Sequence, residues 1–273
     1  MKKSSVLAVT RCLAASAVAI GCALPAQAIV GGTATSNFKS VGPTMGVQVT
    51  PDWVLTANHV GLPAGQTFVN GYGTRTVAAI YRFPDAGLFP LHDFAIMRLV
   101  PATTLAPYLE VSSTLFPNST FTPVPATIVS GANPSGSRGY AFNYFSEFST
   151  LIDPDDSGPL TPVVANYLLS YDSAVHVEGN DSGGALFLGH VLDSLSPLLG
   201  ITSARIEDDN LVPIGSGFVE ISAYRAWIDA TMASDPADNQ VLNWVSVVPE
   251  PASALLWACG VVAVMTRLRR RPA

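Results

Sequence analysis

The sequence predicts an all-β fold for the central part of the chain. Short runs rich in Val, Ile, Tyr and Phe alternate with turns rich in Gly, Pro, Asn and Asp, and only one stretch repeats apolar residues at helical spacing. The candidate strands are MGVQVT, TVAAIYRF, FAIMRLV, PATIVSG, ANYLLSY and GALFLG, at residues 45–50, 76–83, 94–100, 125–131, 165–171 and 184–189. The helical spacing joins Ile221, Tyr224, Ile228 and Met232.

The first 28 residues are typical of a secretory signal peptide. Basic residues come first, an apolar stretch runs from Cys12 to Leu24, and the small-residue pattern Ala26-Gln27-Ala28 follows. We therefore expect cleavage after Ala28 and removal of residues 1–28. A lipoprotein signal at Cys22 is the alternative, but Ala19 stands where such signals favour Leu.

Residues 248–273 have the features of a second targeting signal. They combine a Pro-Glu-Pro motif, an apolar run from Ala252 to Met265 and a terminal cluster of four arginines. The apolar run is shorter than the roughly 20 residues that span a bilayer comfortably, and the arginines would stay on the cytoplasmic side. The segment resembles the PEP-CTERM sorting signal of Gram-negative bacteria, which a membrane exosortase is thought to remove. A plain C-terminal membrane anchor is the alternative.

The region between these ends is strongly acidic. Seven of the 14 Lys and Arg residues lie near the ends of the chain, and all 20 Asp and Glu residues lie between these two basic groups. The intervening region therefore has 7 basic and 20 acidic side chains, a net charge of −13, which argues against nucleic-acid binding and for a soluble extracellular protein. Because Cys12, Cys22 and Cys259 all lie in the end segments, we expect no disulfide in the body.

One folded domain is expected between the ends, at residues 29–233. Its length suffices for one large or two small hydrophobic cores. The polar stretch SDPADNQ follows the helical segment, so residues 234–247 are predicted to be a linker. The acidic stretch DPDDSG at 153–158 resembles a calcium loop, but Val164 stands where that loop needs Glu, so we expect a solvated turn and no metal or other cofactor.

Three separated stretches carry the residue types that together hydrolyse acyl bonds. DWVLTANHVG ends an apolar run near His59, LHDFAIMRL places Asp93 before another, and EGNDSGGALF places Ser182 between an aspartate and two glycines. A serine hydroxyl becomes nucleophilic beside an imidazole, and a buried carboxylate fixes the imidazole tautomer and stabilises the imidazolium. His59, Asp93 and Ser182 are therefore a candidate catalytic triad.

These stretches resemble the trypsin-like (chymotrypsin-fold) serine peptidases, over essentially all of residues 29–233. LTANH, HDFAIMRL and NDSGGA stand where the family has its His, Asp and Ser boxes, LLGITS resembles the strand that lines the substrate cleft, and ISAYRAWI resembles the entry to the C-terminal helix. The resemblance implies two six-stranded antiparallel β-barrels with a C-terminal helix. His59 and Asp93 would come from the first barrel and Ser182 from the second.

The resemblance also implies the groups that support the triad. The backbone amides of Asn180 and Ser182 would form the oxyanion hole, and Ser203 would hydrogen-bond Asp93. Preorganised donors of this kind each contribute about 3 kcal/mol to transition-state stabilisation.

The sequence departs from the family pattern beside His59 and just before Ser182. Asn180 replaces a glycine, Asn58 replaces a small alanine beside His59, and Val60 replaces a cysteine. Asn is among the few residues other than Gly that tolerate positive φ, so the oxyanion hole is the part of the site that the sequence constrains least. The stretch from Ile29 to His59 is short, and we expect a trimmed first hairpin.

The start of the expected mature chain has a further implication. The motif Ile29-Val30-Gly31-Gly32 directly follows the predicted signal-peptidase site. In the family a newly cut terminus of this kind turns inward, and its ammonium pairs with the aspartate before the nucleophile, here Asp181. Signal peptidase would then also activate the enzyme. The simpler alternative is that Ile29 and Val30 only begin a strand.

The specificity pocket is predicted from His176, six residues before Ser182. Trypsin itself has a carboxylate at this position, which binds Arg and Lys. A histidine cannot supply that fixed negative charge, so we expect no strong preference for Arg or Lys. Glu178 lies close enough that a shifted loop would change the assignment.

Together these features predict a secreted serine endopeptidase at the cell surface or in the matrix of a Gram-negative bacterium. Its partners would be protein or peptide substrates, with signal peptidase and exosortase as processing enzymes. It would contact the membrane only through its C-terminal segment and would bind no nucleic acid. The alternative is an inactive family member that acts as a cell-surface or matrix binding protein, which Asn180 and Asn58 would favour if they distorted the site.

Overall fold

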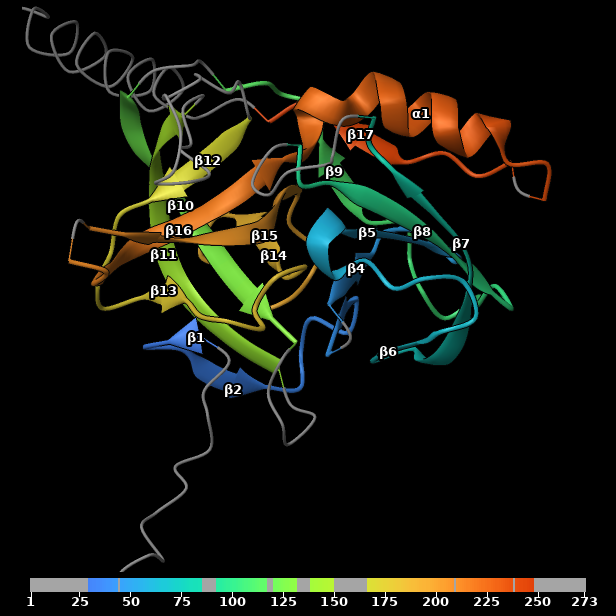
Figure 1. Ribbon diagram of the computed structural model, residues 1–273, viewed down its shortest axis with the longest axis horizontal. Coiled ribbons are helices and arrows are strands. Elements are labelled where there is room, and N and C mark those ends of the chain that lie inside the picture. The colour runs from blue at the N-terminus through green and yellow to red at the C-terminus, as the bar shows by residue number, and fades with distance from the viewer. Residues whose placement is uncertain are drawn as a thin grey trace, which may run out of the picture.

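Two antiparallel β-sheets, each rolled into a barrel, make up most of the fold (Figure 1). The computed structural model describes residues 29–43, 45–84, 92–116, 120–131, 138–149, 166–208, 210–237 and 239–247. The predicted signal peptide, the predicted sorting signal and the acidic stretch at 153–158 lie outside the described residues.

The first barrel is a six-stranded sheet in the order β3-β4-β5-β8-β7-β6. Its strands are β3 (Val41–Gly42), β4 (Gly46–Gln48), β5 (Trp53–Thr56), β6 (Thr67–Asn70), β7 (Gly73–Arg82) and β8 (Ala95–Val100). The Gly71 amide donates to the Lys39 carbonyl at 2.9 Å, which brings the β6 end of the sheet against the β3 end. The β3–β4 hairpin is short, with Val41 paired to Val47 and Gly42 to Gly46.

The second barrel has six strands that form a closed ring. These are β10 (Thr120–Ser130), β11 (Arg138–Ser149), β12 (Tyr167–Ser170), β16 (Pro213–Glu220), β15 (Leu198–Glu207) and β14 (Ala185–Leu188), and β14 pairs with both β10 and β15. Pairing β14 with β15 leaves no free edge in this ring. All six strands predicted from composition and alternation fall within the two barrels.

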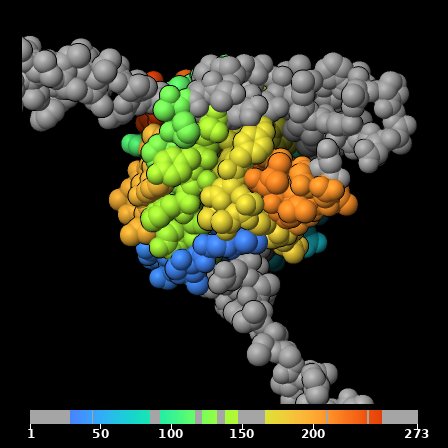
Figure 2. Space-filling view, turned by 90° about the vertical axis from the view of Figure 1, so that its left-hand side faces the viewer, coloured from blue at the N-terminus to red at the C-terminus, as the bar shows by residue number. Residues whose placement is uncertain are grey.

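Three short strands fasten the start of the chain to the second barrel. Strand β1 (Ile29–Val30) pairs with β13 (His176–Val177), and β2 (Thr33–Thr35) pairs with β11. In Figure 2 the blue residues of β1 and β2 lie along the lower edge of this barrel. Ile29 is fully buried, so the position of the predicted mature N-terminus is fixed by core packing.

The aromatic stretch at the start of β11 alternates between core and solvent, as a half-buried strand does. Phe145 is buried, whereas Phe142 and Tyr144 are exposed. His190 stacks on Phe142 and meets Tyr144 edge to face, each at a centroid distance of 4.9 Å. The stretch packs in the β10–β11 hairpin.

The predicted helix begins as a tighter turn. Residues Ile221–Tyr224 form the 3-10 helix η2, and the α-helix α1 covers Arg225–Ser234. The four residues at helical spacing are all buried, which confirms the apolar stripe that predicted the helix. Beyond the helix, the Asp235 carboxylate accepts hydrogen bonds from Arg98 at 2.7 Å and Tyr81 at 2.8 Å, which ties the end of α1 to the first barrel.

The segment predicted to be a linker, 234–247, is partly folded, which corrects that prediction. Strand β17 (Asn243–Val245) pairs in parallel with β9 (Glu110–Ser112), the short strand that follows the first barrel. Leu242 and Val247 are buried, and Trp244 Nε1 donates to Asp229 of α1 at 2.8 Å. The polar composition of SDPADNQ concealed these apolar anchors just beyond it. No helix among the described residues is long and apolar enough to cross a membrane.

A buried carboxyl group in the second barrel makes the stability of the fold depend on pH. Glu220 is 1% exposed, and its Oε1 accepts hydrogen bonds from the Phe116 amide at 2.8 Å and from Ser222 Oγ at 3.0 Å. Its Oε2 has no hydrogen-bond partner among the described residues. Burial raises the pKa of Glu220 from 4.5 to about 7 despite these two donors.

We expect Glu220→Gln to stabilise the protein at pH 8.5 but not at pH 4. Because the pKa is higher in the folded state, the folded state keeps its proton more strongly, and stability from this group is lost as pH rises from 4.5 through about 7. This rise in the pKa of Glu220 corresponds to a loss of about 3 kcal/mol in the free energy of unfolding at pH 8.5, which the glutamine variant would avoid. Denaturant unfolding at both pH values measures it, with the exposed Glu110→Gln as control. An equal change in unfolding free energy at both pH values would contradict the prediction.

Candidate functional site

The predicted triad residues of the first barrel meet at the end of β5. His59 lies in the 3-10 turn η1 (Asn58–Val60), which follows β5, and Asp93 lies just before β8. Since β5 and β8 are neighbours in the sheet, both residues emerge at the same edge. The two oxygens of Asp93 are both used: Oδ1 accepts from the His59 amide at 2.9 Å, and Oδ2 lies 2.7 Å from His59 Nδ1.

Ser182 reaches the same point from the second barrel. It lies in the turn before β14, and its Oγ is 2.9 Å from His59 Nε2. The next residue, Gly183, has a φ of +82°, and a Cβ atom there would lie 2.6 Å from the Met45 carbonyl oxygen of the first barrel. Only glycine fits such a contact at this φ. This explains why glycine follows the serine and how the turn comes so close to the first barrel.

The Asp93 carboxylate is held by a chain of buried hydroxyl groups. Asp93 is 2% exposed, and Ser203 Oγ donates to its Oδ2. Ser203 Oγ lies 2.8 Å from the hydroxyl of Tyr167, a β12 residue. Burial raises the pKa of Tyr167 well above its usual value, and the Asp93 charge adds to the effect. The sequence predicted the strand that contains Tyr167 but gave no signal for its contact with Ser203.

Asn58, the departure from the family pattern beside His59, has a partner that the sequence did not predict. The Arg82 guanidinium donates to the Asn58 carbonyl at 2.5 Å and also to the Asn58 side chain. Arg82 is the last residue of β7 and pairs with Ala95, two residues after Asp93. One residue therefore connects the turn that carries His59 to the strand that follows Asp93, in a body whose sequence lacks cysteine.

Asn180 adopts the backbone conformation expected where the family has glycine, with a φ of +80°. In the described part of the chain, the amides of Asn180 and Ser182 donate to no protein acceptor. Two free N–H groups beside a serine hydroxyl are what an oxyanion hole requires.

Asp181 is buried beneath this turn, 2% exposed, without a cationic partner among the described residues. Its Oδ1 accepts from Ser130 Oγ at 2.6 Å and its Oδ2 from the Glu178 amide at 2.7 Å. Burial outweighs both donors and raises the pKa of Asp181 to about 7. Ile29 pairs with Val177, the neighbour of Glu178. In this chain Ala28 is still bonded to Ile29, so Ile29 carries no ammonium group.

A cavity of about 490 Å³ opens beside His59 and Ser182. Its other lining residues are Val177, Glu178, Gly179, Thr202, Ser203, Ala204, Arg205 and Glu207. His176, from which the specificity pocket was predicted, is buried and does not line the cavity. Glu178, which a shifted loop would place in the pocket, does line the cavity, and its Oε1 lies 3.1 Å from His176 Nε2.

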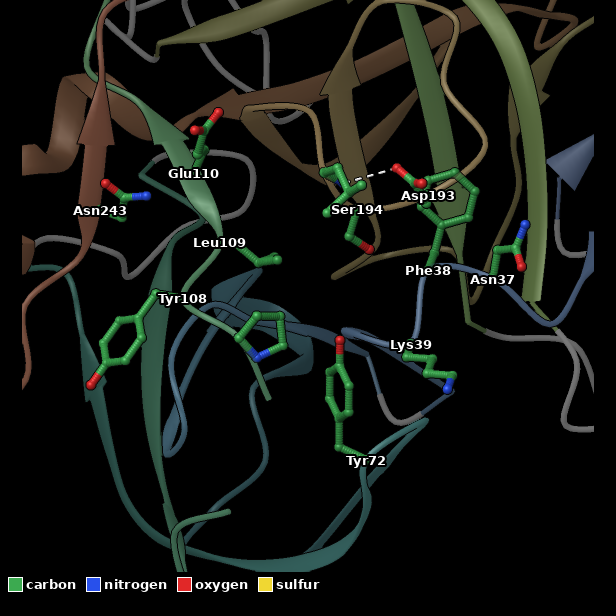
Figure 3. Close-up of a pocket in the computed structure, with 12 residues that line it drawn as sticks. Asn37, Phe38, Lys39, Tyr72, Tyr108, Leu109, Glu110, Asp193, Ser194 and Asn243 are labelled. Carbon is green, nitrogen blue, oxygen red and sulfur yellow. Dashed lines mark hydrogen bonds between the residues drawn. The ribbon is translucent and has the colours of Figure 1, made fainter. Parts of the chain in front are cut away.

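A second cavity, of about 460 Å³, lies where the barrels meet and shares no residue with the first (Figure 3). Phe38 and Leu109 are buried in its wall, and Tyr72 points toward its centre. It contains neither a histidine nor a cysteine, and its one serine, Ser194, bonds Ser40 at 2.9 Å. Of these two cavities, only the one beside Ser182 therefore combines a serine with a histidine.

Comparison with known proteins agrees with this arrangement. The family model described as Trypsin matches residues 29–228. The chain belongs to the trypsin family, and it is a trypsin-like serine peptidase with protein or peptide substrates. A similar solved structure is neuropsin, a serine protease expressed in the limbic system of mouse brain. It is 19% identical, with a TM-score of 0.51 over 68% of this chain and 87% of that chain. No curated protein matches the chain.

Proposed function

We propose that the protein is an active secreted serine endopeptidase in which Ser182 is the nucleophile. The observation that carries the proposal is the continuous line of contacts from Ser182 Oγ through His59 to Asp93, at 2.9 Å and 2.7 Å. A serine, an imidazole and a buried carboxylate in this order form the arrangement that activates a hydroxyl for acyl transfer.

In the proposed hydrolysis of a peptide bond, each of these residues has a defined role. Ser182 Oγ attacks the scissile carbonyl carbon while His59 Nε2 takes its proton, and Asp93 stabilises the imidazolium through Nδ1–H. The oxyanion forms beside the amides of Asn180 and Ser182. His59 next gives the proton to the leaving amine, which breaks the peptide bond and leaves an acyl group on Ser182. A water molecule, deprotonated by His59, hydrolyses that ester and restores the serine.

Maturation at Ile29 completes the site in this proposal. In the described part of the chain, Asp181 is a buried carboxyl group without a cationic partner. Ile29 pairs with Val177, which precedes the Glu178 amide that donates to Asp181. Cleavage after Ala28 by signal peptidase would create an ammonium group in this region. Its pairing with Asp181 would fix the backbone of the Asn180–Ser182 turn.

Export of the protein and loss of its C-terminal segment belong to the same proposal. The signals at 1–28 and 248–273 support it, with exosortase as the second processing enzyme and the surface or matrix of a Gram-negative bacterium as destination. Intact mass of the protein released by its native host should exclude residues 267–273. Their presence would contradict removal of this segment.

A fluorophosphonate probe tests the catalytic proposal directly. We expect the matured protein to be labelled and Ser182→Ala to remain unlabelled, with Ser194→Ala as a matched control that labels like the wild type. Ser194 lines the second cavity, away from His59. If correctly matured wild-type protein takes no label, the protein is not an active serine peptidase, and the inactive binding protein becomes the better interpretation.

A further inference from the structure

Four side chains form a polar network across the wall of the cavity beside Ser182. His176 Nε2 lies 3.1 Å from Glu178 Oε1, Arg205 Nη1 donates to Glu178 Oε2 at 2.5 Å, and Arg205 Nη2 donates to Glu207 Oε1. Glu178, Arg205 and Glu207 line the cavity, and their side chains are 35%, 37% and 27% exposed. A substrate side chain that enters this cavity next to Ser182 therefore meets the network.

The contacts of the network favour the charged form of Glu178. Partial burial opposes ionisation of Glu178, but hydrogen bonds from His176 and Arg205 and the charge of Arg205 outweigh burial and lower its pKa. Slight burial likewise opposes the charge of Arg205, but Glu207 and Glu178 outweigh it and raise its pKa. The guanidinium thus lies between two ionised carboxylates, and with His176 neutral the network has a net charge of −1.

We propose that Arg205 determines the substrate class of this cavity by acting as an internal cation. Its guanidinium occupies the place between Glu178 and Glu207 that the side chain of a substrate Arg or Lys would take, so the cavity accepts a neutral polar side chain, above all the amide of Gln or Asn. The proposal rests on the proposed function, because it assigns a preference to the reaction at Ser182.

The preference for a substrate amide follows from the hydrogen-bond donors and acceptors that the network itself does not use. A guanidinium has five N–H donors, and the contacts with the two glutamates leave several of them for the carbonyl oxygen of a substrate amide. Among the described residues Glu207 Oε2 has no hydrogen-bond partner, and it can accept from the amide nitrogen. One amide group thus satisfies both neighbours without breaking either ion pair.

Other side chains fit less well for separate reasons. A substrate carboxylate would face two like charges, and a large apolar side chain would take the network out of water without new partners. A substrate Arg or Lys would have to share the carboxylates with Arg205 or displace it. The cavity should therefore rank Gln above Arg, Lys, Leu and Glu.

Substitution of Arg205 provides the sharpest test, because it predicts a gain. Peptides that differ only before the scissile bond, with Gln, Arg or Glu, are compared by kcat/KM on the matured protein. Arg205→Gln should raise kcat/KM for Arg relative to Gln by about tenfold or more, since two carboxylates become free to bind a cation. Arg205→Lys keeps the charge and should keep the wild-type ranking, as should Arg225→Gln, which alters an exposed arginine on α1.

Two further variants keep the test decisive. Glu207→Gln added to Arg205→Gln should remove most of the gain, because one of the two carboxylates is gone. Glu207→Gln alone makes the network neutral and should improve cleavage after Glu, which tests the proposal even if Arg205→Gln fails to fold. Folding of each variant is checked by fluorophosphonate labelling.

Two results would overturn the inference. One is a wild-type enzyme that already cleaves mainly after Arg, and the other is an Arg-to-Gln ratio that Arg205→Gln leaves unchanged. Both outcomes require labelled, active wild-type protein. A wild-type protein that takes no label is a different result, because it contradicts the proposed function itself.

Discussion

Protein that begins at Ala28 is expected to turn over a peptide substrate about 10²- to 10³-fold more slowly than protein that begins at Ile29, although both fold alike. The extra residue replaces the Ile29 ammonium with a peptide bond, which removes the proposed partner of Asp181. Loss of one partner of a buried ion pair costs about 3 to 5 kcal/mol. Burial raises the pKa of Asp181 to about 7 in the uncut chain, and a nearby ammonium would lower it again.

Two comparisons isolate this effect. Asp181→Asn should reduce turnover of the Ile29 form to a similar degree and should leave the Ala28 form little changed. Activity of the Ile29 form should also fall at high pH, as the α-amino group loses its proton above its usual pKa of about 8, by an amount that the pairing sets. Equal turnover of the two forms would mean that Ile29 and Val30 only begin strand β1.

Asp93→Asn is expected to lower kcat by about 10⁴-fold with little change in KM. The carboxylate accepts from both the His59 amide and the His59 ring in the wild type. An asparagine amide keeps the shape but cannot accept at both positions, so the ring is held in the wrong tautomer and the imidazolium loses its counter-charge.

The control for this variant is Asp193→Asn, which removes an exposed carboxylate from the loop beside the second cavity. It should leave kcat unchanged. Steady-state kinetics on a peptide ester, with folding checked by circular dichroism, measures both variants. A loss of less than tenfold for Asp93→Asn would show that the carboxylate has no essential role in orienting His59.

The strands of the barrels were predictable because their signals are local. The runs that became β7 and β8 combine apolar alternation with β-branched residues, and turn residues flank them. The pairing of β17 with β9 was not predictable in this way. It joins three-residue segments more than a hundred residues apart, and its anchors, Leu242 and Val247, are isolated apolar residues in a polar stretch.

The residues of the candidate site also fall into a group that local motifs predicted and a group that they did not. His59, Asp93 and Ser182 could be found because each lies in a motif whose neighbours are constrained by a tight turn or a strand end. The support from Tyr167 and Arg82, and the network around Arg205, depend on contacts between different strands and turns, which form only in the folded chain. Asn180 shows an intermediate case, because its residue type alone indicated that the positive φ found there was tolerable.

Strand β17 also determines how the protein would respond to mechanical tension. It is the last described strand, and three residue pairs with β9 and a bond from the Val247 amide to Thr114 at 2.8 Å hold it in place. The second barrel is a closed ring, whereas β17 is paired with another strand along one side only and is otherwise held by the Trp244 bond to Asp229 of α1 at 2.8 Å and by the buried side chains of Leu242 and Val247. A pull on the C-terminal end would therefore detach β17 first. Residues 235–247, once fully extended, would span at most roughly 45 Å, and the load would reach α1 before it reached the strands that hold Ser182.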